Sequence, residues 1–410
     1  MRLPGALILA AGVAVLAGCP RREEATRVVV RSNRLPDGLF DRLTIEVRRP
    51  GATQACAGCV REFAASELTG SGVATFALAS LDEPPVVQVM LWRSRGKAPR
   101  ASAAVTVTGT FAAGAEVEVR LPWDAVGRPV GSWSEPVDLG SLPALPGDPV
   151  VGGACAVAPA DDEVCVPGAL FWFGDPSVNL IGGADREGND ERLVLLSPFL
   201  IDAAEVTVGQ FRASKLAALN VPIRHEVDAQ CSYTEEPGAS EDVPVTCAIW
   251  PMADAHCRQR GRRLPTEAEL EFLMGGRGSR RYVWGDDMPE CGDTIFGERT
   301  CGLDGPAVAG QGTRDRLRIG DRTVLDLTGN VSEWTADRWN STREGCFAEP
   351  LLRDPRCEAE SPSSPGLRVV RGGSWLDIAI DMGASLRFAS QGTLSYNQQS
   401  GWRCAREAGP

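Results

Sequence analysis

One segment of the chain holds residue types that could do chemistry, and it reads "RGGSWLDIAIDM" from Arg371 to Met382. A Gly-Gly turn precedes Ser374, and Asp377 and Asp381 follow four positions apart. Two carboxylates at this spacing could share acid–base work or hold a divalent cation, while a solvated loop face is the simpler interpretation. The segment has no cysteine and no histidine, although the chain has 13 cysteines. Thiol chemistry within the segment is therefore excluded.

Two helices are readable in the domain that must position this segment. In "PMADAHCRQRG", Pro251 suits a first helical turn and Gly261 suits a stop. In "LPTEAELEFLMGG", Thr266 and Glu269 form a capping box. An apolar stripe follows at Leu270, Leu273 and Met274, closed by Gly275. The pattern of the remaining residues predicts loops and short strands. Because a domain with so little regular structure needs other stabilisation, we expect disulfides or bound cations.

Length, composition and charge limit the class of protein. The 410 residues allow two or three domains, and 45 Gly with 29 Pro favour short strands and many loops. The formal charge is −12. Nucleic acid is therefore not an expected partner, because phosphate binding needs a cationic face.

The first 19 residues predict a targeting segment. Arg2 is followed by an apolar stretch too short to span a bilayer, and "LAGC" ending at Cys19 resembles the bacterial lipobox. A lipoprotein signal peptide (residues 1–19) with lipidation at Cys19 would anchor the protein to a membrane. Pro20 stands where an Asp typically retains lipoproteins at the inner membrane. We therefore expect a cell-envelope protein, with the outer membrane favoured.

The twelve remaining cysteines predict disulfides, because an exported chain meets an oxidising compartment. Four pairs would close short loops: Cys155 with Cys165, Cys231 with Cys247, Cys291 with Cys301, and Cys346 with Cys357. The residues left over are Cys56, Cys59, Cys257 and Cys404, and spacing leaves their pairing open.

The chain divides into two predicted domains. After a charged tether (residues 20–26), residues 27–123 hold six Val- and Thr-rich segments with partial alternation, which indicate a small all-β sandwich. A Pro- and Gly-rich stretch at residues 124–162 predicts a linker. A second domain would then occupy residues 163–410.

Seven pieces of this second domain together resemble the formylglycine-generating enzyme, or sulfatase-modifying factor, family. In chain order they are "SPFLIDAAEVTVGQF", "PVTCAIWPMADAHC", "GRRLPTEAELEF", "YVWGDD", "VLDLTGNVSEWTADRW", "VVRGGSW" and "GWRC". The resemblance implies an α/β (α+β) C-type-lectin-like fold with little regular secondary structure. It also implies a disulfide between Cys257 and Cys404, which would leave Cys56 and Cys59 as a pair.

The resemblance implies that the segment Arg371–Met382 corresponds to a copper centre whose usual cysteine ligands are absent here. In the oxidases of this family, two cysteines after the Gly-Gly-Ser turn bind Cu(I) and activate oxygen to oxidise a sulfatase cysteine. Cu(I) prefers sulfur ligands. The two family positions fall on Asp377 and Met382 here. The sequence therefore argues against copper and against sulfatase activation by that mechanism.

Calcium is the cation that the resemblance favours. The family pattern at "GNVSEW" places a cation between backbone carbonyls and a glutamate, which corresponds to Gly329, Asn330, Val331 and Glu333. Hard oxygen ligands suit Ca²⁺. The alternative is that Asn330 and Glu333 only cap a turn and pair with an arginine.

Two functions follow from these observations. The first is a non-catalytic binding or scaffold module on a lipid anchor, with a protein or glycan of the envelope as ligand. The second is an enzyme of the same family with altered chemistry in the same groove, with Asp377, Ser374, Asp381 and Arg387 as the polar groups to test. Asp377 and Asp381 would have to converge on one concave pocket for the second reading to hold.

Overall fold

The structure is a computed structural model. It describes residues 26–32, 39–55, 58–64, 67, 73–78, 84–95, 98–111, 117–121, 125–142, 153–175, 191–214, 216, 222–224, 227–297, 301–341, 345–392 and 396–409. The chain forms two compact units, Met1–Pro149 and Val150–Pro410. Cys19 and Cys56, to which the sequence assigned lipidation and a disulfide, lie outside the described residues.

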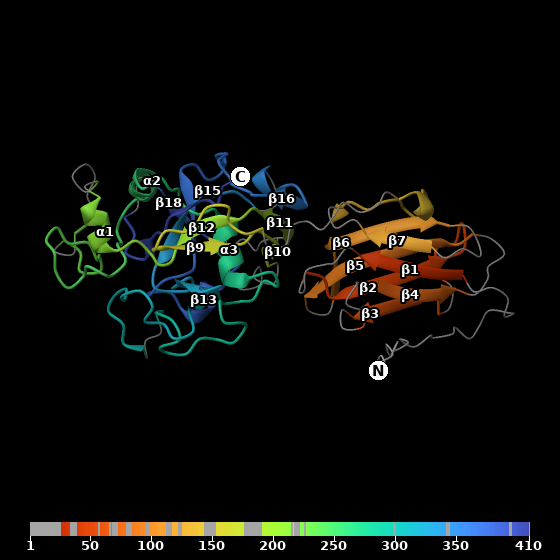
Figure 1. Ribbon diagram of the computed structural model, residues 1–410, viewed down its shortest axis with the longest axis horizontal. Coiled ribbons are helices and arrows are strands. Elements are labelled where there is room, and N and C mark those ends of the chain that lie inside the picture. Colours follow the sequence, from red (N-terminus) through yellow and green to blue (C-terminus); the bar gives the residue numbers. More distant parts are fainter. Residues whose placement is uncertain are drawn as a thin grey trace, which may run out of the picture. The chain divides into compact units, whose positions relative to one another are not determined.

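The first unit contains two β-sheets, drawn in red and orange in Figure 1. Its strands are β1 (Thr26–Ser32), β2 (Arg42–Arg48), β3 (Val60–Ala64), β4 (Val73–Leu78), β5 (Val86–Arg95), β6 (Ala98–Thr110), β7 (Val117–Leu121) and β8 (Val137–Asp138). The sheet orders are β3-β2-β5-β6-β8 and β4-β1-β7. Along β2, Leu43, Ile45 and Val47 are buried and their neighbours are not, so one face of the larger sheet packs against a core.

All six strands predicted from the sequence are present, and two further strands were missed. β3 follows the "CAGC" loop, and β8 lies inside the stretch expected to be a linker. That stretch also contains a short 3-10 helix (Leu139–Ser141), and Val126 and Leu139 are fully buried. Residues 125–142 therefore belong to the first unit, and the linker is shorter than the sequence indicated.

The described residues of the second unit form short strands and short helices. The elements are β9 (Glu163–Val166), β10 (Ala169–Phe173), β11 (Arg192–Leu196), β12 (Phe199–Asp202), α1 (Val208–Ala213), α2 (Trp250–Gln259), α3 (Glu267–Gly275), β13 (Arg316–Ile319), β14 (Arg322–Leu325), β15 (Ser332–Arg338), η7 (Gly345–Phe347), β16 (Leu351–Arg353), β17 (Leu367–Arg371), η8 (Ala379–Met382), β18 (Phe388–Gln391), β19 (Ser400–Gly401) and β20 (Ala405–Glu407). Its sheets are β10-β11-β16, β20-β12-β9, β13-β14 and β18-β17-β15-β19. The expectation of little helix is confirmed, since the longest described helix has 10 residues.

Local signals explain where the helices begin. Pro251 stands in the first turn of α2, where its missing N–H costs no hydrogen bond. The capping box of Thr266 and Glu269 is present at α3, as the sequence predicted. A second capping box, Thr207 with Gln210, begins α1, which the sequence analysis did not identify.

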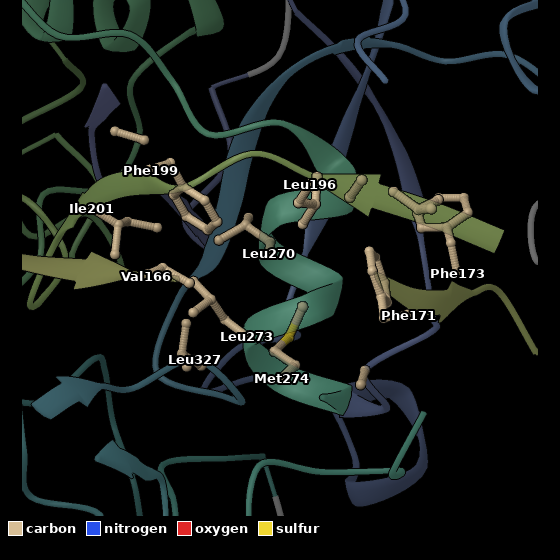
Figure 2. Close-up of a cluster of buried hydrophobic side chains, with 14 of the residues drawn as sticks. Val166, Phe171, Phe173, Leu196, Phe199, Ile201, Leu270, Leu273, Met274 and Leu327 are labelled. Atoms are coloured by element: carbon tan, nitrogen blue, oxygen red, sulfur yellow. The ribbon is translucent and has the colours of Figure 1, made fainter. Parts of the chain in front are cut away.

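Helix α3 lies at the centre of the main apolar core of this unit (Figure 2). Leu270, Leu273 and Met274 pack in one cluster with side chains of β9, β10, β11 and β12. The other face of α3 is also buried, yet it carries Glu267, Glu269 and Glu271. A helix buried on all sides with three acids on it needs cationic partners, because an unpaired buried carboxylate is costly.

Five disulfides lie within the described residues of the second unit. They are Cys155–Cys165, Cys231–Cys247, Cys257–Cys404, Cys291–Cys301 and Cys346–Cys357. The four loop-closing pairs and the long-range pair all match the sequence analysis. This many disulfides indicate an oxidising compartment outside the cytoplasm. Within the described part of the chain, none of the helices has the length and apolar character needed to cross a membrane.

Candidate functional site

The segment Arg371–Met382 leaves β17 through a turn that only glycine can make. Gly372 and Gly373 have φ values of 96° and 71°. A Cβ on Gly373 would lie 2.7 Å from Cγ of Met382, and one on Gly372 would lie 2.8 Å from the carbonyl oxygen of Leu327. The turn therefore packs closely against the backbone of Leu327, which leaves no room for a side chain at Gly372. β17 in turn pairs with β15, where Arg371 stands opposite Glu333.

The side chain of Asp377 is held by two neutral donors. The Ser374 hydroxyl donates to Asp377 Oδ2 at 2.7 Å, and the Gln399 amide donates to Asp377 Oδ1 at 3.1 Å. Gly297 N–H also donates to the Asp377 carbonyl at 2.8 Å. Gln399 was not identified from the sequence, and nothing near it in the chain signals this contact. Asp377 thus stabilises its own loop.

Asp377 and Asp381 lie close enough to affect each other. Burial raises the pKa of Asp377, the hydrogen bond from Ser374 lowers it, and the negative charge of Asp381 raises it further. Asp381 itself is 8% exposed. The second unit has a hollow lined by residues of α1 and α2 and by Arg260, and neither Asp377 nor Asp381 lines it. This hollow is therefore not the concave acid pocket that an altered enzyme would need.

Met382 fills an apolar pocket. It is fully buried in a cluster with Tyr282 and Phe296. The Tyr282 hydroxyl donates to the Ala379 carbonyl at 2.9 Å, which fixes the end of the segment. The thioether is packed as a hydrophobic group.

Arg387 belongs to a buried ion cluster on α3 and does not contact the acid pair. Its Nε donates to Glu267 Oε1 at 2.7 Å, and Arg371 Nη2 lies 2.6 Å from the same oxygen. Arg371 also lies 2.7 Å from Glu271. Burial raises the pKa of Glu267, but the two guanidinium charges outweigh it and the pKa is lowered. Arg387 is thus a structural partner of α3.

The residues expected to bind calcium use their side chains in other contacts. Arg403 Nε lies 2.8 Å from both carboxylate oxygens of Glu333. Asn330 takes a left-handed conformation (φ 59°), its Oδ1 accepts from Ala307 N–H at 2.9 Å, and its amide donates to Glu205 at 3.1 Å. Asn330 therefore shapes the turn. Its backbone carbonyl, which the family pattern would offer to the cation, accepts from Trp375 N–H at 2.9 Å.

Two acids near the residues predicted to bind calcium, Glu205 and Asp326, each have a carboxylate oxygen without a hydrogen-bond partner in the described part of the chain. These oxygens are Glu205 Oε2 and Asp326 Oδ1, although the residues are only 2% and 1% exposed. Burial and then the charge of Asp326 raise the pKa of Glu205 well above its usual range. Burial also raises the pKa of Asp326. A hard cation such as Ca²⁺ would satisfy buried carboxylate oxygens of this kind, so these two oxygens fit two of the ligands that the ion needs.

Sequence reasoning missed both of these acids. Asp326 stands three residues before Gly329, within the quoted motif "VLDLTGN", so it could have been found. Glu205 is 125 positions from Asn330, and only the fold brings it there.

Comparison with known proteins identifies the second unit. Residues 150–408 match the family described as the sulfatase-modifying factor enzyme 1-like domain. The chain belongs to the sulfatase-modifying factor family. The sulfatase-modifying factor domain is 28% identical over 260 residues to the formylglycine-generating enzyme of Thermomonospora curvata, covering 53% of this chain and 83% of that protein.

Two further similarities come from an inactive relative and a solved structure. The sulfatase-modifying factor domain is 30% identical over 184 residues to the inactive C-alpha-formylglycine-generating enzyme 2 of Mus musculus. That match covers 41% of this chain and 50% of the mouse protein, so the chain spans half of that relative's length. The structure of PvdO from Pseudomonas aeruginosa aligns with 63% of this chain and 100% of its own, at 19% identity and a TM-score of 0.47.

Proposed function

We propose that the sulfatase-modifying factor domain of this protein is a non-catalytic binding module of the bacterial envelope. One observation carries the proposal: the two positions that hold Cu(I) thiolates in the oxidases are Asp377, bonded to Ser374 and Gln399, and Met382, fully buried. A carboxylate bound to neutral donors is a poor Cu(I) ligand. The name of the mouse relative records an inactive member of the same family.

The same turn offers a surface for a protein ligand. Leu376 is 37% exposed and Ile378 is 52% exposed, on either side of Asp377. Met288, 48% exposed, lies beside them, because Tyr282 OH contacts both its sulfur and the Ala379 carbonyl. Exposed aliphatic groups gathered on one loop favour a protein partner with an apolar side chain over a glycan, which presents hydroxyl groups.

Attachment and calcium complete the proposal. Lipidation at Cys19 would tether the protein to the outer membrane, which would place the module in the envelope where a protein ligand can meet it. A calcium ion bound by Glu205 and Asp326 would stabilise the loop that ends at Gly329. Gly329 N–H donates to the Gly372 carbonyl at 2.9 Å, so this loop supports the turn that presents Leu376 and Ile378.

The copper arm of the proposal is tested with the full chain by anaerobic Cu(I) titration against a competing chelator. A peptide carrying the sulfatase motif is then assayed for cysteine oxidation. We expect no tight copper binding and no oxidised peptide. Tight binding together with peptide oxidation would overturn the proposal and restore an oxidase function.

The binding arm is tested with envelope extract and a crosslinkable form of the full chain. The double variant Leu376→Ser/Ile378→Ser should lose any partner that the unchanged protein captures. Val157→Ser, at a side chain that is 42% exposed and lies beside Gly409, is the control and should retain it. Equal capture by both variants would remove this loop as the binding surface.

A further inference from the structure

A hollow between α1 and α2 has the features of a second ligand site, independent of the proposed function. Its volume is about 560 Å³, within the range of small-molecule sites. It is lined by Gln210, Ala213, Ser214, His256, Gln259 and Arg260. Gln259 Nε2 donates to the Ser214 carbonyl at 2.9 Å, which ties its two walls together.

His256 supplies an unused hydrogen-bond donor in this hollow. The imidazole is 2% exposed, and its Nδ1 accepts from Trp402 Nε1 at 3.3 Å. The proton of the neutral ring must then sit on Nε2. Nε2 has no hydrogen-bond partner among the described residues, and the ring is fixed between Phe211 and Trp402, whose centroids lie 5.8 and 5.7 Å away.

The surroundings of His256 keep its imidazole neutral. Burial, and then the charges of Arg260 and Arg262, lower the pKa of His256 to about 4. The imidazole therefore keeps a single N–H donor at ordinary pH. Arg260 also lines the hollow, where its guanidinium is paired with Asp202 at 2.7 Å and with Asp162.

Gln210 supplies a second donor. Its Oε1 accepts from Thr207 N–H at 3.1 Å in the capping box of α1. Gln210 is exposed, and its amide N–H groups have no partner in the described part of the chain. Because His256 and Gln210 both line the hollow, they offer two neutral donors to a ligand there, and a carboxylate has two oxygens to accept from them.

We propose that this hollow binds a carboxylate, with His256 Nε2–H and the Gln210 amide as donors and Arg260 as the neighbouring charge. The volume leaves room for the rest of a small acid or for the last residues of a peptide. Both sources share the same recognition chemistry.

The test uses isothermal titration calorimetry and imidazole NMR on the full chain. Glutarate represents a free acid, N-acetyl-alanyl-alanine represents a peptide C-terminus, and the amide of the same peptide is the uncharged control. The chain has only two histidines, so His225→Gln leaves His256 as the single imidazole signal. We expect binding of at least one acid, a shift of the His256 Nε2–H signal, and no response to the amide.

Gln210→Glu is the decisive variant. Glutamate keeps the capping box, because Glu and Gln serve equally at that position. It also places a negative charge in the hollow, which should weaken acid binding by at least about tenfold. Gln391→Glu, an exposed position outside the hollow, is the control and should leave binding unchanged.

Response to glutarate alone would assign a free acid, and response to the peptide alone would assign a chain terminus. Equal binding of acid and amide, no binding of either acid, or full binding by Gln210→Glu would overturn the proposal.

Discussion

Glu267 and Glu205 are both buried glutamates of the same unit, but their environments differ. Glu267 accepts from Arg371 and Arg387, and its pKa is lowered. Glu205 has one oxygen without a partner among the described residues, and its pKa is raised well above the usual range. The first acid is satisfied by cations of its own chain. The second must keep its proton or bind a cation from solution, so the comparison separates a structural acid from a candidate ligand.

Asp377 stands between these two cases. Both of its oxygens accept hydrogen bonds, but from neutral donors, and burial raises its pKa. Asp377 is thus a structural acid of its loop. The predictions that follow test this ranking of Glu267, Glu205 and Asp377.

Replacing Glu267 should have the largest effect. Glu267→Gln leaves Arg387 without its carboxylate at a buried position, and breaking such a pair costs about 3–5 kcal/mol of unfolding free energy. Urea denaturation measures it. Arg258→Gln, which removes an exposed i,i+4 pair with Asp254, is the control and should cost about 0.3–0.5 kcal/mol. Similar losses for both variants would contradict a structural role for Glu267.

Calcium should have the next largest effect. A ligand at 100 times its Kd stabilises by about 2.7 kcal/mol, which corresponds to a rise in Tm of about 5–10 °C for a domain of this size. Differential scanning calorimetry in Ca²⁺ and in chelator measures the shift. Asp326→Asn should abolish the response, and asparagine tolerates the left-handed backbone at that residue (φ 51°). Asp377→Asn should keep it, and an unchanged Tm in chelator would remove the site.

The free energy of unfolding should depend on pH because two other buried acids, Asp315 and Asp337, have raised pKa values. Burial raises the pKa of Asp315 to about 8 and that of Asp337 to about 7. Between pH 6.5 and 8, above most of the range in which His256 of the unfolded chain titrates, the native state then holds more protons than the unfolded state, so stability falls as pH rises. We expect a loss of about 2 kcal/mol across this window, by urea denaturation in chelator. Rising stability over the same window would mean that these acids are ionised in the native protein.

Replacing Asp377 should have the smallest effect. Asp377→Asn keeps an acceptor for Ser374 and weakens only the contact with Gln399, so we expect a loss of about 1 kcal/mol. Chemical denaturation measures it, with Ser374→Ala as the partner variant in a double-mutant cycle. A loss as large as that of Glu267→Gln would place Asp377 among the acids on which the fold depends.

Short-range signals made much of the fold predictable. The capping box of α3, Pro251 at the start of α2 and the glycines before Ser374 each act within a few residues, so the sequence states them directly. The four loop-closing disulfides join cysteines 10 to 16 positions apart. The Cys257–Cys404 bond spans 147 positions, and only the resemblance to a family supplied it.

The tertiary structure decided which buried acids are satisfied. Glu267 meets Arg387 across 120 positions, and Glu205 meets Asn330 across 125. Nothing local distinguishes these glutamates, because the partner that lowers or fails to lower each pKa arrives from a distant part of the chain. The same holds for Trp402, which comes from 146 positions away to fix the tautomer of His256. The sequence thus determined the local elements, and packing determined which polar groups remain available to a ligand.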